Sequence, residues 1–221
     1  MTTAQRLDGP LVLPASGAAP KAMVIFLHGY GSNGDDLISL APYWQAGLPQ
    51  VVFLSPNAPQ PCPGAPGGYQ WWGLTSFTPE SRVAGVRQAA PVLDAFIDDM
   101  LARYGLTEDR LALVGFSQGT MMALQVGLRR RRQLAGVIGY SGMLAEAPDP
   151  ATGSFTKPPV LLVHGDADPM IPVTALPQAQ AALQAVGVEV ATHVSRGLGH
   201  SIDQAGLQLG GEFLQRVLSA G

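Results

Sequence analysis

The sequence contains little charge, one cysteine and no long apolar run. Only 13% of its 221 residues are charged and the formal net charge is −3, so the chain has no basic field that could hold the phosphate backbone of a nucleic acid or an anionic membrane. The single cysteine, Cys62, excludes an intrachain disulfide framework. The longest apolar run, near residues 23–27, is far shorter than the roughly 20 residues that a membrane-spanning helix needs. We therefore expect no nucleic-acid partner and no membrane span.

The first residues also lack the basic stretch followed by an apolar run that marks a secretory signal peptide. Together with the single cysteine, this favours a reducing, cytoplasmic location. Intrinsic disorder is excluded, because 47% of the residues are hydrophobic and can form a sizeable core.

Short apolar runs alternate with helical patterns along the chain. Most runs are continuous, which is typical of parallel strands covered on both faces. Between Arg82 and Tyr104, apolar residues recur at steps of three or four, and a second such stripe closes the chain. Pro91 is expected to kink the first of these helices. The alternation predicts one α/β domain over residues 1–221 with a mostly parallel, doubly wound sheet. The predicted strands are residues 22–27, 51–55, 110–115, 135–141, 159–164 and 188–194.

Residues 56–79 break this alternation. Prolines and glycines dominate the first part of the segment and aromatic residues the second, so we expect no regular structure there. A loop of this length in a compact domain usually has a function. The loop either lines a binding pocket, with Trp72, Leu74 and Phe77 as substrate contacts, or its tryptophans pack against the loop itself.

Residues 115–119, with the sequence Gly-Phe-Ser-Gln-Gly, follow a predicted strand and precede a helical run over residues 120–128. A tight strand-to-helix turn strains the backbone of its central residue and requires very small neighbours, so the glycines leave the Ser117 hydroxyl exposed above the sheet. The helix would begin at this point, with its free amide groups facing the charge that develops on an attacked carbonyl. The pattern predicts a nucleophile elbow centred on Ser117, and the simpler alternative is a surface serine in a tight turn.

Four histidines could act as the base for this serine. In the chain order of α/β-hydrolases, the acid follows the serine and the histidine comes last. His28 and His164 close apolar strands ahead of the candidate acids, and His193 lies inside an alternating strand pattern. His200 lies in a glycine-containing loop between the last predicted strand and the last helix, so the order favours His200.

Two aspartates compete for the role of the acid. Both lie in the loop that follows the predicted strand 159–164. Asp168 is farther from the strand end and is followed by Pro169, whereas Asp166 beside Gly165 resembles a residue that caps a turn. The acid is needed to hold the imidazole in the correct tautomer and to stabilise the imidazolium. Spacing alone favours Asp168 and leaves Asp166 open.

An oxyanion formed at this serine needs two N–H donors. The α/β-hydrolase arrangement takes one from the residue after the nucleophile, here Gln118, and one from the loop after an early strand. That loop is residues 28–32, where Gly29 and Gly31 allow the backbone to approach a substrate closely. Tyr30 is the candidate for the second donor, through its backbone N–H.

The same early loop satisfies the glycine spacing of a dinucleotide-binding site, at Gly29, Gly31 and Gly34. Such a site also needs an acidic residue near the end of the next strand to bind the ribose. No Asp or Glu occurs between Asp36 and Glu80. A nicotinamide-dependent oxidoreductase is therefore the weaker interpretation.

Four segments resemble the phospholipase/carboxylesterase family of α/β-hydrolases, which includes the acyl-protein thioesterases. They are residues 26–31, 115–119, 164–169 and 199–200. The resemblance covers nearly the whole chain and implies an α/β-hydrolase fold without a separate lid domain. It implies a catalytic triad of Ser117, Asp168 and His200, with the backbone N–H groups of Tyr30 and Gln118 as oxyanion donors.

The family hydrolyses carboxylic esters and thioesters of short to medium acyl chains without a metal or other cofactor, so the resemblance implies a serine esterase that acts on a small-molecule ester. Met170 and Ile171, beside the predicted acid, are added as candidate substrate contacts. Tyr30, where the thioesterase branch usually has leucine, and the proline- and glycine-rich residues 61–68 favour a carboxylesterase of the bacterial type. The alternatives are an acyl-protein thioesterase or lysophospholipase, and a noncatalytic small-molecule binder on a hydrolase fold. A homodimer is one expectation for its assembly.

Other motifs favour ordinary structural roles. Arg129 to Arg132 end the helix that begins at the elbow, where cations suit the negative end of the dipole, so we expect a solvated helix terminus. Ser141, in Gly-Tyr-Ser-Gly, lacks the elbow spacing and indicates a turn at a strand end. No group of His, Cys and acidic residues has the spacing of a metal site.

Overall fold

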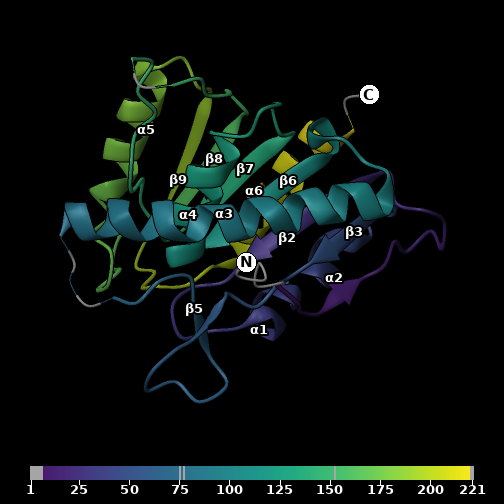
Figure 1. Cartoon of the computed structure of the whole chain (residues 1–221), viewed down its shortest axis with the longest axis horizontal. Coiled ribbons are helices and arrows are strands. Elements are labelled where there is room, and N and C mark those ends of the chain that lie inside the picture. The colour runs from purple at the N-terminus through teal and green to yellow at the C-terminus, as the bar shows by residue number, and fades with distance from the viewer. Residues whose placement is uncertain (1–6, 75, 77, 152, 220–221) are drawn as a thin grey trace, which may run out of the picture.

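A seven-stranded sheet runs through the centre of the computed structural model, which describes residues 7–74, 76, 78–151 and 153–219. The strand order is β1-β3-β2-β6-β7-β8-β9 (Figure 1). All neighbouring strands pair in parallel except β1 (Leu11–Val12), which is antiparallel to β3. The expectation of a mostly parallel sheet is thus confirmed. The six parallel strands are β2 (Ala22–Leu27), β3 (Val51–Leu54), β6 (Leu111–Phe116), β7 (Gly136–Tyr140), β8 (Val160–Gly165) and β9 (Val190–Ser195).

Helices cover both faces of this sheet, which explains why its central strands are continuous apolar runs, whereas the edge strand β9 is partly exposed. Along β2, Met23, Ile25 and Leu27 pack into one apolar layer, whereas Val24 and Phe26 pack into the other. The first layer is closed by α3 (Pro79–Tyr104), α4 (Gln118–Gly127) and α5 (Ala175–Ala185). The second is closed by α1 (Gly34–Ile38), α2 (Ala41–Gln45) and α6 (Gln204–Leu218).

The longest helix, α3, begins three residues before the predicted start and ends where its sequence signals indicate. The Thr78 side chain accepts a hydrogen bond from the Ser81 N–H at 3.3 Å and caps the first turn. Gly105 ends the helix in the left-handed conformation, with φ of 65°. The helix is continuous through Pro91. A short 3-10 helix, η1 (Glu108–Arg110), then leads into β6.

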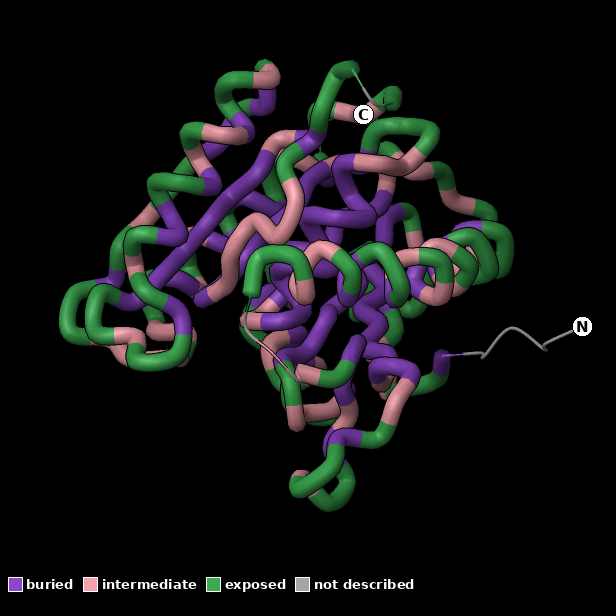
Figure 2. Tube along the Cα trace, turned by 60° about the vertical axis from the view of Figure 1, so that its left-hand side comes forward, coloured by how far each residue is buried: buried purple, intermediate pink, exposed green. Residues whose placement is uncertain are grey.

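The segment 56–79 is more ordered than its composition predicts. Two short strands, β4 (Gln60–Pro61) and β5 (Tyr69–Gln70), pair antiparallel as a ribbon that projects from the body of the molecule (Figure 1). Figure 2 shows the exposed tip of this ribbon and the more buried chain where it joins the body. The expectation of no regular structure is wrong at the ribbon, because Tyr69 also forms a β-bridge with Ser32, and the extended chain thereby gains pairing partners on both sides.

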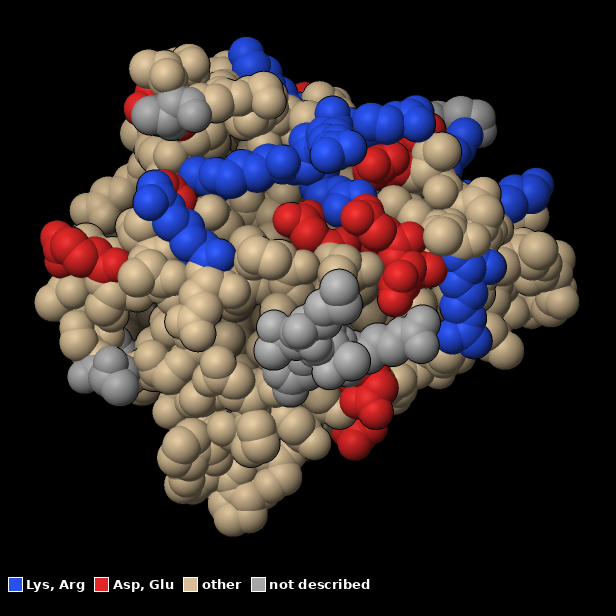
Figure 3. Space-filling model, in the orientation of Figure 1, with Lys and Arg blue, Asp and Glu red and all other residues tan. Residues whose placement is uncertain are grey.

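The four arginines after α4 differ in their surroundings: Arg131 and Arg132 are exposed, as expected of a solvated helix terminus, whereas Arg129 and Arg130 are partly buried. The side chain of Arg130 is only 8% exposed and forms ion pairs with Asp94, Asp98 and Glu108. Figure 3 shows Lys and Arg side chains gathered against Asp and Glu side chains over α3, whereas the projecting ribbon carries neither. The expectation was wrong for Arg130 because α3 and η1 supply acidic partners that lie far from it in the sequence.

Two further features bear on the sequence expectations. Between β7 and β8, the described residues 141–151 and 153–159 contain no helix, so the strand–helix alternation is interrupted there. No helix in the described ranges is long and apolar enough to cross a membrane.

Candidate active site

Ser117 occupies a strained turn between β6 and α4. Its backbone φ is 54° and its ψ is −115°, a conformation that residues other than glycine rarely adopt. The N–H of Ser117 donates to the carbonyl of Tyr140 at 2.9 Å, which anchors the turn to β7. A Cβ atom on Gly119 would lie 1.7 Å from the Leu27 carbonyl oxygen, and one on Gly115 would lie 2.3 Å from the carbonyl oxygen of Gly119. The two glycines are therefore required by close backbone approach, as the elbow motif predicts.

The structure brings His200 and Asp168 together at this turn. The His200 Nδ1 lies 2.7 Å from Asp168 Oδ2. The other carboxylate oxygen accepts hydrogen bonds from the N–H groups of Met170 at 2.8 Å and Ile171 at 3.0 Å. The His200 ring lies 4.9 Å from the ring of Phe116, centre to centre, which places the imidazole next to the residue before Ser117.

Burial acts to raise the pKa of Asp168, but the hydrogen bonds from His200 and from the two N–H groups outweigh it, so the pKa of Asp168 lies below its ordinary value. Asp168 is therefore an ionised acceptor near neutral pH. A carboxylate at Nδ1 selects the imidazole tautomer that carries its proton on Nδ1 and leaves Nε2 as the basic nitrogen.

The competing aspartate has a different role in the structure. Asp166 Oδ1 accepts a hydrogen bond from the Gly197 N–H at 2.6 Å, which closes the turn after β9. Asp166 is exposed, whereas the side chain of Asp168 is inaccessible to solvent. The geometry thus distinguishes two residues that spacing alone left open.

The early loop approaches the elbow closely. A Cβ atom on Gly29 would lie 3.3 Å from the Cβ of Ser117, so the loop backbone runs beside the serine. The structure gives neither the Tyr30 N–H nor the Gln118 N–H a protein acceptor among the described residues. Both are therefore free to donate to an oxygen atom bound beside Ser117. The neighbouring Cys62 thiol raises the pKa of the Tyr30 hydroxyl, whose side chain is 40% exposed.

The predicted substrate contacts differ in their surroundings. Trp72 is only 3% exposed, and a Cβ atom on Gly85 of α3 would lie 2.3 Å from its indole ring. Leu74 is half-buried against the same core, Ile171 is buried, and Met170 is 68% exposed. Phe77 lies outside the described residues. Their contacts with substrate stay predictions.

Sequence reasoning missed two residues that support this arrangement. Ser141 is fully buried, has a φ of 44°, and donates its hydroxyl to the Ser201 carbonyl at 3.1 Å, which secures the loop that carries His200. His164 Nε2 lies 2.9 Å from the Ile171 carbonyl oxygen and 3.3 Å from Asp168 Oδ2. The sequence signal for Ser141 was the pair of glycines at positions 139 and 142, because closely spaced glycines indicate a turn of unusual conformation.

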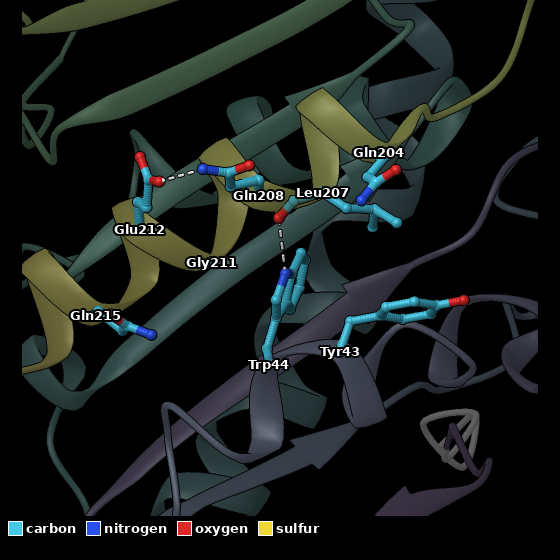
Figure 4. Close-up of a pocket in the computed structure, with 8 residues that line it drawn as sticks. All are labelled: Tyr43, Trp44, Gln204, Leu207, Gln208, Gly211, Glu212 and Gln215. Atoms are coloured by element: carbon cyan, nitrogen blue, oxygen red, sulfur yellow. Dashed lines mark hydrogen bonds between the residues drawn. The ribbon is translucent and has the colours of Figure 1, made fainter.

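A separate groove of about 520 Å³ lies between α2 and α6 (Figure 4). Figure 4 shows Tyr43 pointing outward beside Trp44, whose indole N–H donates to the Leu207 carbonyl at 2.9 Å. Ser117, Asp168 and His200 do not line this groove. In the described part of the chain, no three His, Cys, Asp or Glu side chains lie together as a metal site would require.

Two features define the α/β-hydrolase class. A serine occupies a strained strand-to-helix turn, and a histidine after the last strand is hydrogen-bonded to an aspartate after the preceding strand. Within this class, the chain belongs to the phospholipase/carboxylesterase family, whose profile matches residues 11–218. The resemblance that the sequence motifs indicated is thereby confirmed.

Three similar proteins show how far the likeness extends. The solved structure of esterase PE8 has a TM-score of 0.91 and 43% sequence identity, and the match covers 96% of this chain and 100% of that one. Esterase YpfH of Escherichia coli (strain K12) is 28% identical over 197 residues, which are 89% of this chain and 83% of the relative. Acyl-protein thioesterase 1 of Neurospora crassa is 31% identical over 210 residues, which are 87% of this chain and 84% of the relative.

Proposed function

We propose that this protein is a serine carboxylesterase in which Ser117 is the nucleophile, His200 the general base and Asp168 the residue that orients it. The observation that carries the proposal is the 2.7 Å hydrogen bond between His200 and Asp168 beside the strained turn of Ser117. The names of the similar proteins, two esterases and a thioesterase, support the same reaction class.

The reaction follows from these positions. His200 Nε2 takes the proton of the Ser117 hydroxyl as the oxygen attacks the ester carbonyl, and the N–H groups of Tyr30 and Gln118 stabilise the oxyanion. The protonated His200 then gives that proton to the departing alcohol, and an acyl group remains on Ser117. A water molecule, deprotonated by His200, attacks the acyl group, and the acid product leaves as the proton returns to the serine. Asp168 stays ionised throughout.

Replacing Ser117 with alanine tests the proposal directly. We expect Ser117→Ala to lower the esterase turnover number by several powers of ten, because the acyl-enzyme cannot form. A fluorophosphonate should label the wild-type protein at Ser117 and should not label the variant. Near wild-type activity in the variant, or labelling of a different serine, would indicate another nucleophile. A wild-type protein with no esterase activity and no labelling would support the noncatalytic binder.

We propose short- to medium-chain esters as the substrates, with thioesters as the second candidate. The exposed Met170 and the buried Ile171 follow Asp168 by two and three residues in the sequence and are the proposed contacts on that side. Rates on aryl esters and thioesters of matched and increasing acyl length decide between an esterase and an acyl-protein thioesterase or lysophospholipase. A preference for long acyl thioesters would overturn the carboxylesterase proposal.

The Trp72→Ala variant tests whether the 56–79 loop forms a wall of the acyl site. If it does, the variant changes the ranking of esters by acyl size and loses about 1–3 kcal/mol of transition-state stabilisation on the best substrate. If Trp72 only packs against α3, as its burial on Gly85 favours, the variant melts at a lower temperature and loses activity equally on every ester. Measuring both quantities on one variant separates the two roles.

The remaining proposals concern the whole chain. We propose that residues 1–221 form one domain, that the protein is cytoplasmic, and that it forms a homodimer. Light scattering coupled to size-exclusion chromatography tests the dimer, and cell fractionation tests the location.

A further inference from the structure

Residues 69–72, which run from β5 to the tryptophan pair, are bound to the loop that carries Tyr30. The Gly31 N–H donates to the Tyr69 carbonyl at 2.9 Å, and the Tyr69 N–H donates to the Ser32 carbonyl at 2.7 Å. The indole N–H of Trp71 donates to the His28 carbonyl at 3.0 Å. These three bonds lie on either side of Tyr30 in sequence and fix the loop from which its N–H projects.

The same segment is bound to the elbow by one side chain. Gln118 Oε1 accepts a hydrogen bond from the Trp71 N–H at 2.9 Å, and Gln118 Nε2 donates to the Trp72 carbonyl at 2.9 Å. Gln118 is only 2% exposed, so these bonds lie in a medium of low dielectric, where a lost partner is costly. The two partners also fix which end of the amide carries oxygen, because one is a donor and the other an acceptor.

We infer that the Gln118 carboxamide is a positioning residue that sets the spacing between the two oxyanion donors, through its bonds to Trp71 and Trp72. The inference rests on the proposed function, which assigns those donors to the backbone N–H groups of Tyr30 and Gln118. One donor belongs to a loop with glycines on both sides, whose conformation is not set by a strand or helix. The other belongs to the first turn of α4. Residues 69–72 connect the two donors only while the Gln118 carboxamide keeps its hydrogen bonds to the Trp71 N–H and the Trp72 carbonyl.

A second contact could fix the same spacing. Gly119 lies directly against the Leu27 carbonyl, so the elbow already touches the end of β2. That contact and the contact of Gly29 with Ser117 reach only the first two residues of the early loop, on the N-terminal side of Tyr30, whereas the bonds from residues 69–72 reach both Gly31 and Ser32 on its C-terminal side. The Gln118 side chain therefore contributes positioning that the glycine contact leaves undone.

Chemistry requires a carboxamide at this position. Glutamine accepts from one backbone group and donates to the next, ionised glutamate can only accept, and methionine has the length of glutamine with little capacity for either. Misplacement of a catalytic donor by about 1 Å costs on the order of 100-fold in rate. We expect Gln118→Met to lower the turnover number about 10- to 100-fold, with little change in KM, because an oxyanion exists only after attack.

The experiment measures turnover per active site, KM and melting temperature for Gln118→Met and for a matched control. Active sites are counted by titration with a fluorophosphonate, so that misfolded protein does not enter the rate. The control is Gln70→Met, which removes another buried glutamine from the same loop. Its Nε2 donates to Gln60 Oε1 at 3.1 Å, and among the described residues its side chain forms no hydrogen bond to the elbow. Full turnover per titrated site in Gln118→Met, or an equal loss in both variants, would overturn the inference.

The Gln118→Glu variant gives a second readout that a purely structural role would not produce. A protonated carboxyl can both accept and donate, so the ratio of Glu variant to wild-type turnover should rise as the pH falls. Protonation of groups that both proteins contain, such as His28, affects both rates and cancels in this ratio. A ratio that does not change with pH would contradict the inference even if Gln118→Met failed to fold. Loss of labelling at Ser117 in the wild-type protein would instead defeat the proposed function.

Discussion

Because of His28, the folded protein should lose stability as the pH falls below the pKa of histidine in the unfolded chain. The imidazole is fully buried, and the Ala58 N–H donates to its Nε2 at 2.9 Å. Nε2 therefore carries no proton, and the Nδ1–H donates to the Gly29 carbonyl at 2.7 Å. Burial lowers the pKa of His28, and the bond to Gly29 and the charge of Asp36 only partly oppose this. A second proton would place an N–H group directly against the Ala58 N–H.

The sign and size of the effect follow from proton binding. Histidine in the unfolded chain titrates near about 6.5, and His28 in the folded chain titrates lower. Between these two values the unfolded chain binds a proton that the folded chain does not. The free energy of unfolding therefore falls with falling pH, by at most about 1.4 kcal/mol per pH unit for one histidine. Above the unfolded value, His28 contributes no pH dependence.

The assay is urea unfolding of the wild-type protein and His28→Gln from pH 8 to pH 5. Glutamine can keep an acceptor for Ala58 and does not titrate, so the stability difference between the two proteins should shrink below pH 6.5 by about 1 kcal/mol per unit. His193→Gln, which removes a half-exposed histidine from β9, is the matched control and should retain the wild-type slope. Parallel stability curves for the wild-type protein and His28→Gln would refute the reasoning.

Three further variants test the remaining contacts. Asp168→Asn should lower turnover by about 10³- to 10⁴-fold because it loses the ionised acceptor at His200, whereas Asp166→Asn should only lower the melting temperature; kinetics and melting curves that reversed these effects would exchange the two assignments. Ser141→Ala releases the loop that carries the histidine, so the turnover number should fall severalfold with KM nearly constant, and steady-state kinetics that show only a raised KM would argue against it. Gly85→Ala forces a methyl group into the Trp72 ring and should destabilise the fold by about 1–3 kcal/mol in urea unfolding; an unchanged midpoint would mean that the ring can move aside.

The parallel core and the elbow could be predicted from the sequence because each depends on neighbouring residues. The apolar runs, most of them continuous, predicted all six parallel strands to within about two residues at each end. The elbow motif carries its own geometric requirement, since Gly115 and Gly119 have no room for a side chain. The family resemblance drew on the same local motifs, and the profile match over residues 11–218 confirms it.

Only the tertiary structure decided contacts between segments that lie far apart in the chain. The bonds from Gln118 to Trp71 and Trp72 span 47 and 46 residues, and the bond from Ser141 to the histidine loop spans 60. The sequence indicated a solvent-exposed Arg130 because its acidic partners lie in α3 and η1, more than 20 residues away in the chain. Periodicity and turn motifs report what a residue does with its near neighbours in sequence. They carry no record of which distant backbone group a buried side chain meets, because that depends on how the crossover helices and loops close over the sheet.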